Sequence, residues 1–256
     1  MLYGCCASAE DYALVADAGY DYVELSGREL SVMPEGEYLH FRDRIRNGPI
    51  PALRINDFCG REVPLLGPSF ELRTVTVYAR SLIRRAAELG VEKLGIGSPL
   101  ARSIPEGFQR DRAQDQFCSS LRALADIAGE YSLSVMLEPL NDGVCNYVNH
   151  TREAAELVSA IGYPCLSLVF DFHHADLMGE TAEDYGPYLA VTGHVHVSDH
   201  VGAERSYLLR DGAGKYEKWG EAIRNCGYSG TLSVETGGNH SLPELVENLS
   251  LMKAYF

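Results

Sequence analysis

The stretch SLSVMLEPLNDGVCNYVNHTREAAELVSAIGYPCLSLVFDFHHADLMGE, residues 132–180, decides the fold of this chain. It contains two predicted strands, SVMLE and CLSLVFD, which end at Glu138 and Asp171. Between them lies the predicted helix TREAAELVSAIG, which ends at Gly162. A strand, a helix and a second strand in that order predict parallel strands whose carboxyl ends share one edge of a sheet. We therefore expect the two carboxylates to lie together there, as parts of a metal or proton-transfer site.

The same alternation runs through the rest of the chain. The six further predicted strands are LYGCC (2–6), YDYVELS (20–26), PALRIND (51–57), VEKLGIG (91–97), VTGHVHVSD (191–199) and GTLSVET (230–236). Helical patterns follow the strands, including a short helix expected from Thr181 to near Ala190, and residues 200–219 are expected to form a long loop. This pattern predicts one (β/α)8 barrel domain over residues 1–256. The alternative, a doubly wound open sheet, usually carries a Gly-rich phosphate loop after its first strand, and this sequence has none.

The last four predicted strands each have two unlike faces, because alternate residues of a strand point in opposite directions. One face is aliphatic and suits packing beneath helices. The other is smaller and more polar, which suits the inside of a barrel, and it carries four potential ligands at the carboxyl ends of the strands: Glu138, Asp171, His196 and Glu235. Barrel enzymes build their sites at this end. We therefore predict that these four side chains form one site.

A cation is expected at this site, because three carboxylates in a small space repel one another unless a positive charge neutralises them. Oxygen donors with one imidazole suit Mn²⁺, Mg²⁺ or Co²⁺, and Mn²⁺ is the metal we expect first. Zn²⁺ is a further candidate, although it more typically binds thiolates or several imidazoles. Glu24, Asn56 and the loops 98–108 and 200–215 are expected to wall the pocket, and Asp199 is expected behind the ligands.

Composition limits the partners and the setting. The 256 residues carry a formal net charge of −14, which opposes binding to nucleic acid and to anionic membranes. No apolar run approaches the roughly 20 residues of a membrane span, and the first residues lack a signal-peptide layout. The seven cysteines show no CxxC spacing, which favours a reducing, cytoplasmic setting. The sequence leaves a homo-oligomer open.

Five motifs resemble those of the xylose isomerase-like barrel superfamily: EPLN (138–141), DFHH (171–174), GHVHVSD (193–199), DGAG (211–214) and GYSGTLSVE (227–235). Their style is most similar to the sugar isomerases and epimerases related to tagatose 3-epimerase and hydroxypyruvate isomerase. The motifs cover the last four strands, and the first half is similar in architecture. The resemblance implies a divalent metal held by Glu138, Asp171, His196 and Glu235. It also implies proton transfer by Glu138 and Glu235 on opposite sides of a substrate, and a contact from His174 to a substrate oxygen.

Two positions depart from the ketohexose epimerases. A glutamate that follows the first ligand by six residues in those enzymes is replaced by Val144, and an arginine that follows the ligand histidine by six is replaced by Gly202. Arg205 and Arg210 are the candidates to substitute for that arginine and to bind substrate. We therefore expect a substrate that is recognised differently from a free ketohexose.

The resemblance and the residues together predict a function. Removing a proton beside a carbonyl creates an enediolate, whose charge a chelating cation stabilises. We predict a metal-dependent isomerase or epimerase of a small sugar, keto-sugar or related polyol. One alternative is a metal-dependent dehydratase of a cyclic polyol or keto acid, of the inosose or dehydroshikimate type, and another is a non-enzymatic metal- or sugar-binding barrel. A three-zinc DNA-repair endonuclease of the same superfamily is disfavoured, because the early strands lack the extra histidines and the chain is acidic.

Overall fold

The strands β5 (Ser134–Leu137) and β6 (Leu166–Asp171) of the 132–180 stretch pair in parallel, as predicted, with the helix α7 (Thr151–Ile161) between them. The structure is a computed structural model that describes residues 1–189, 191–202, 204–237 and 239–256. Gly162 ends α7 with φ +72°, a left-handed conformation that suits glycine and that stops the helix. The decisive stretch is therefore one βαβ unit of the sheet.

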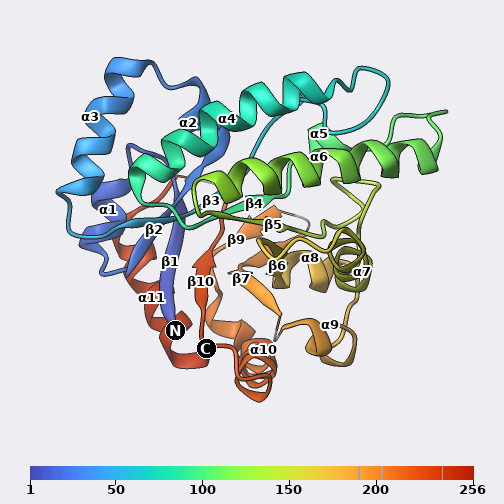
Figure 1. The fold of residues 1–256 in the computed structure, drawn as a ribbon. Helices are drawn as coiled ribbons and strands as arrows, with labels where there is room; N and C mark the ends of the chain where they lie inside the picture. Colours follow the sequence, from blue (N-terminus) through green and yellow to red (C-terminus); the bar gives the residue numbers. More distant parts are fainter. Residues whose placement is uncertain (190, 203, 238) are drawn as a thin grey trace.

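Eight parallel strands close into a barrel in the order β1-β10-β7-β6-β5-β4-β3-β2 (Figure 1). The register Leu2↔Thr231 to Cys5↔Val234 joins the first strand to the last and closes the ring. This confirms the predicted (β/α)8 barrel. The remaining barrel strands are β1 (Leu2–Ala7), β2 (Tyr22–Ser26), β3 (Ala52–Asn56), β4 (Lys93–Ile96), β7 (Thr192–Val197) and β10 (Thr231–Val234).

Helices surround the barrel, and the two longest, α4 and α6, pack against each other (Figure 1). Aliphatic side chains on the outer face of the strands, such as Val195 and Val197 on β7, are fully buried. The helices besides α7 are α1 (Tyr12–Asp17), α3 (Glu35–Arg46), α4 (Leu72–Leu89), α6 (Arg110–Glu130), α9 (Ala182–Leu189), α10 (Ala213–Asn225) and α11 (Leu242–Tyr255).

Several short elements lie where the sequence predicted loops. An antiparallel hairpin of β8 (Asp199–Val201) and β9 (Glu204–Ser206) follows β7. The other short elements are α2 (Gly27–Val32), α5 (Pro99–Arg102), α8 (Phe172–Leu177) and the 3-10 turn η1 (Arg210–Gly212). The expected helix end at Ala190 and residue 203 of the expected loop wall lie outside the described residues.

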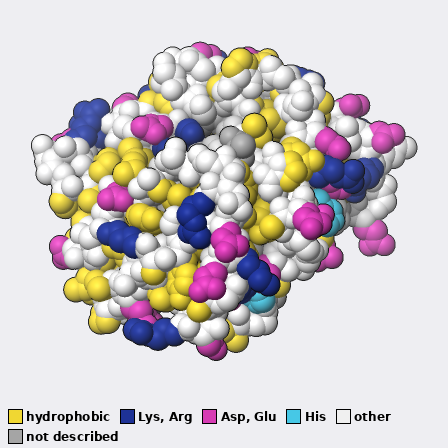
Figure 2. Space-filling model, turned by 90° about the horizontal axis from the view of Figure 1, so that it is seen from below, with side chains coloured by type: hydrophobic (Ala, Val, Ile, Leu, Met, Phe, Trp, Pro, Cys, Tyr) yellow, Lys and Arg dark blue, Asp and Glu magenta, His cyan; other side chains and the backbone are white. Residues whose placement is uncertain are grey.

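Charged side chains of both signs lie on the surface (Figure 2), and the helices are those of a chain without long apolar runs. Lys and Arg side chains form separate groups beside Asp and Glu on the face drawn in Figure 2. None of the helices in the described part of the chain has the length and apolar character needed to span a bilayer.

Candidate metal centre

Four side chains from four strands meet at the carboxyl end of the barrel. Glu138 directly follows β5, and Asp171 is the last residue of β6. His196 lies on β7, and Glu235 directly follows β10. Each offers a ligand atom, and these atoms lie within 4.8 Å of one another. The structure thus brings together all four residues that the sequence predicts as ligands.

Backbone pairing explains why the two glutamates face this point. The amide of Glu138 donates to the carbonyl of Ile96 over 3.2 Å, and that of Glu235 donates to the carbonyl of Val197 over the same distance. Each glutamate is thereby held in line with a neighbouring strand. Gly97 leaves room for one of them, since a Cβ there would lie 2.5 Å from Glu138 Oε2.

The geometry around His196 fits a divalent cation. Its Nδ1 lies 3.2 Å from Glu138 Oε1, 3.1 Å from Glu235 Oε2 and 3.8 Å from Asp171 Oδ2. One ring nitrogen cannot provide a hydrogen for three carboxylates. Glu235 Oε2 is buried and makes no well-directed hydrogen bond, although it lies 2.9 Å from a guanidinium nitrogen of Arg205. An oxygen-rich donor set with one imidazole suits Mn²⁺, Mg²⁺ or Co²⁺.

The three carboxylates titrate differently. Burial raises the pKa of Glu138 to about 7, although its hydrogen bond to His196 lowers it. Burial also raises the pKa of Asp171 and Glu235, but the positive charges of Arg205 and His196 outweigh burial and hold both below their ordinary values. The site therefore combines two ionised carboxylates, Asp171 and Glu235, with a third, Glu138, whose pKa of about 7 lies close to neutral pH.

Arg205, His174 and Asn56 lie at the cluster, as the sequence predicts. A guanidinium nitrogen of Arg205 lies 2.5 Å from Asp171 Oδ2 and 3.1 Å from His174 Nε2. Asn56 donates to Glu235 Oε1 over 3.1 Å. Burial lowers the pKa of His174 to about 3, so its imidazole is neutral. Asn141 lies 2.8 Å from His174 Nδ1 with its amide nitrogen, so both ring nitrogens of His174 face donor groups.

Three residues lie elsewhere than expected. Glu24 is fully buried beneath His196, so it does not wall a pocket open to substrate. The side chain of Arg210 is 80% exposed and pairs with Glu247 over 2.5 Å, because the turn η1 directs it to the surface. Asp199 lies 2.6 Å from Lys215 Nζ and also accepts from Tyr216, not from a ligand. These placements correct the expectations for Glu24, Arg210 and Asp199.

Arg102 is a buried residue that the sequence reasoning missed. It is fully buried, and its guanidinium donates to the carbonyls of Gly97, Glu138 and Tyr147 over 2.6, 2.6 and 2.8 Å. It therefore ties the ends of β4 and β5 to the loop before α7. It ends the four-residue helix α5, which is too short to show a periodic pattern that would predict this burial.

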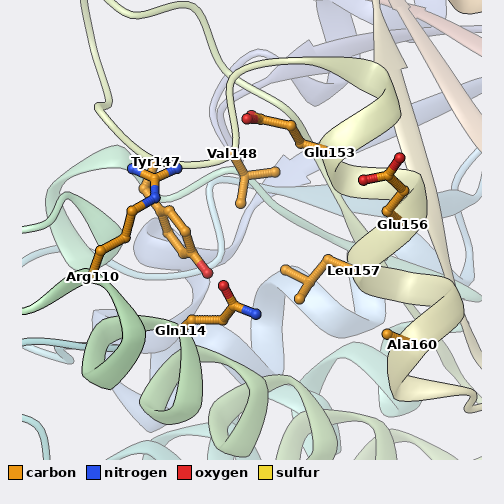
Figure 3. Close-up of a pocket in the computed structure, with 8 residues that line it drawn as sticks. All are labelled: Arg110, Gln114, Tyr147, Val148, Glu153, Glu156, Leu157 and Ala160. Carbon is orange, nitrogen blue, oxygen red and sulfur yellow. The ribbon is translucent and has the colours of Figure 1, made fainter.

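Two cavities flank this end of the molecule. One, of about 650 Å³, opens beside Glu235 and is lined by Cys6, Ser8, Glu10, Asp11, Asn56, Glu235, Thr236, Asn239 and His240. The other, of about 320 Å³, lies between α6 and α7, where the guanidinium of Arg110 stands 5.2 Å from the ring centroid of Tyr147 (Figure 3). Only the first cavity includes a residue of the cluster.

Comparisons with known proteins identify relatives of this chain and structures with a similar fold. The hydroxypyruvate isomerase of Escherichia coli is 25% identical over 158 residues, which is 60% of this chain and 58% of that protein. The matched parts of the first three curated relatives cover 43 to 63% of their lengths. Among solved structures, D-psicose 3-epimerase of Clostridium cellulolyticum with D-tagatose has a TM-score of 0.85 at 17% identity, over 100% of this chain and 99% of that one. The IOLI protein with a zinc atom has a TM-score of 0.76 at 18% identity, over 100 and 99%.

These structural likenesses show the shared fold. The sequence profile of the xylose isomerase-like TIM barrel family matches residues 12–255, nearly the whole chain. This match confirms the resemblance inferred from the five motifs. The protein belongs to the xylose isomerase-like TIM barrel family.

Proposed function

We propose that the protein is a divalent-metal-dependent isomerase or epimerase that moves a proton next to the carbonyl of a small sugar, keto-sugar or related polyol. The observation that carries this proposal is the meeting of Glu138 and Glu235 with Asp171 and His196 around one point. Relatives named hydroxypyruvate isomerase and inosose isomerase support the reaction class.

Glu138, Asp171, His196 and Glu235 would hold the metal, and Mn²⁺ is our first expectation because three of the four donors are carboxylates. The zinc atom bound by the IOLI protein supports a divalent ion on this fold. When bound, such an ion neutralises the carboxylates and stabilises negative charge that develops beside a carbonyl.

The proton transfer is assigned to the two glutamates. Glu235, whose pKa is held low by Arg205 and His196 against the effect of burial, is ionised and would accept the carbon-bound proton. Glu138, whose pKa burial raises to about 7, would deliver a proton from the other side of the site. His174 and Arg205, which lie 3.1 Å apart at the cluster, would hold a substrate oxygen.

The cavity beside Glu235 supports a hydroxyl-rich, uncharged substrate. Its side chains include carboxylates and amides that accept hydrogen bonds from hydroxyl groups, and none of its lining residues is Lys or Arg. Among the described residues, neither Glu10 nor Asp11 has a cationic group within 4.0 Å to offset its charge. A phosphate in this cavity would be repelled, so we expect free polyols to be preferred to their phosphates.

The remaining expectations follow from charge and cysteine chemistry. The net charge of −14 supports a small-molecule substrate over nucleic acid. All seven cysteines are free thiols, which supports a cytoplasmic setting.

Deuterium exchange tests the proposed reaction. The protein is incubated with Mn²⁺ in D₂O with a panel of ketoses, inososes and hydroxy-keto acids, and deuterium is expected at the carbon beside the carbonyl. Glu235→Gln should lower the exchange rate by about 10²–10⁴-fold, the usual contribution of a general base. Glu180→Gln is the matched control, because Glu180 is also buried and bonded to a histidine, His150, but is not part of the cluster.

Two other outcomes would replace the proposal. Loss of water without exchange into recovered substrate would assign a dehydratase. A panel member that binds with measured affinity but shows neither exchange nor turnover would assign a binding barrel.

A further inference from the structure

Glu24 lies inside the barrel between two histidines, His194 and His196. It lies on β2, is fully buried, and has no access to the cavity beside Glu235. Its Oε2 lies 2.8 Å from His194 Nε2, and its Oε1 lies 3.0 Å from His196 Nε2. A carboxylate can only accept hydrogen bonds, so each imidazole must present an Nε2–H to it.

A second set of contacts holds the far side of His194. Arg54 Nε donates to Thr231 Oγ1 over 3.1 Å, and an arginine can only donate. His194 Nδ1 lies 2.8 Å from that hydroxyl and 3.0 Å from the backbone carbonyl oxygen of Thr231. His194 is thereby held with its Nε2 facing Glu24.

These contacts form one hydrogen-bonded line through the barrel interior. It begins at Glu92, which is 2.8 Å from Arg54 Nη1 and whose side chain is 58% exposed, and it ends at the carboxylate cluster. All of its inner members are nearly or fully buried: Arg54, Thr231, His194, Glu24 and His196. Bulk water therefore does not compete for these hydrogen bonds, and their direction persists.

We propose that Glu24 is a positioning residue that, with His194, Thr231 and Arg54, keeps a hydrogen of His196 on Nε2, so that Nδ1 is the nitrogen that faces the three carboxylates and is left to bind the metal. A neutral imidazole binds a metal through the nitrogen that carries no hydrogen. These hydrogen bonds thus orient His196 as a ligand from the side of its ring that points away from the carboxylate cluster. Partners of this kind, behind a ligand histidine, typically contribute about 10–100-fold to metal affinity.

The inference rests on the proposed metal site. Its first test uses the metal-free protein, so that a failure of the inference can be told apart from a failure of the proposed function. Long-range ¹H–¹⁵N spectra of the imidazole rings report which nitrogen carries the hydrogen. In the metal-free wild type we expect His196 to carry a hydrogen on Nε2. In Glu24→Gln, whose amide donates as well as accepts, we expect part of the molecules to lose that hydrogen.

Calorimetric titration with Mn²⁺ gives the second readout. Glu24→Gln should raise the Kd about 10–100-fold. Thr231→Val, which keeps the side-chain shape but removes the hydroxyl, should raise it less. Glu180→Gln should leave it unchanged, because Glu180 bonds to Thr151 and His150 away from the cluster.

Two results would overturn the inference. One is a His196 that carries no hydrogen on Nε2 in the metal-free wild type. The other is a folded Glu24→Gln that binds Mn²⁺ within twofold of wild type. If Glu24→Gln does not fold, the wild-type spectrum and the Kd of Thr231→Val decide, and an unchanged Kd in Thr231→Val would count against the line. If deuterium exchange is absent while Nε2 of His196 carries its hydrogen, the result would instead count against the proposed function alone.

Discussion

At the scale of single residues, Asp171 and Asp199 show how two aspartates near the ends of neighbouring strands, β6 and β7, have different roles. Asp171 is fully buried at the cluster, whereas Asp199 bonds to Lys215 and Tyr216 on the far side of the hairpin. Asp171→Ala should therefore abolish Mn²⁺ binding in a calorimetric titration. Asp199→Asn should leave the Kd unchanged, and a weakened Kd would show that Asp199 acts on the ligands after all.

Asp199 should matter instead for stability, and its effect should depend on pH. Burial raises its pKa, but hydrogen bonds from Lys215 and Tyr216 outweigh burial and hold the pKa below 3.8. A carboxylate with a lowered pKa stabilises the fold above its unfolded pKa, and this stabilisation is lost as pH falls through the folded pKa. In urea unfolding, Asp199→Asn should cost about 1.5–3 kcal/mol at pH 7 and markedly less near pH 3. An equal cost at both pH values would contradict this assignment.

At the scale of elements, the β8–β9 hairpin is what brings a positive charge to the site. The sequence between β7 and α10 predicts a loop, but residues 199–201 pair with residues 204–206 and direct Arg205 toward Asp171 and Glu235. The next arginine along the chain, Arg210, follows the hairpin and remains at the surface. The insertion after β7 therefore decides which of the two candidate arginines reaches the cluster.

Replacing each arginine should separate these two positions. Arg205→Met leaves two buried carboxylates without their cation, which typically costs about 3–5 kcal/mol, so the metal-free thermal midpoint should fall by several degrees. Saturating Mn²⁺ should recover part of that loss. Arg210→Met removes an exposed pair with Glu247 and should change stability by less than about 1 kcal/mol. Equal shifts in the two variants would show that Arg205 has no special electrostatic role.

At the scale of the whole molecule, the barrel interior is polar along its length, from Arg54 through His194 and Glu24 to the carboxylate cluster. A ligand that binds only the folded barrel stabilises it by RT ln(1 + [L]/Kd). Mn²⁺ at 100 times its Kd should therefore raise the free energy of unfolding by about 2.7 kcal/mol, and EDTA should reverse this. Thermal unfolding measures the effect. A shift that persists in Asp171→Ala would place the ion at another site.

The sequence by itself determined the barrel and the four residues of the cluster. Alternation of strands and helices predicts parallel strands, and the two-residue period of a strand assigns each side chain to the inside or the outside. Glu138, Asp171, His196 and Glu235 are all inside residues at strand ends, so barrel closure alone brings them together. These inferences need only local patterns, because every strand obeys the same geometry.

Only the tertiary structure decided what surrounds the cluster. Glu24 and His196 are 172 residues apart in the chain, and β2 and β7 are not neighbours in the sheet, so their contact depends on the closed barrel and its register. Arg102 and Arg205 reach the site from a four-residue helix and a hairpin that no hydrophobic period predicts. The physical reason is the same for all three residues. A side chain that crosses the lumen or a loop is placed by the distance between distant backbones, and a local pattern of polar and apolar residues does not encode that distance.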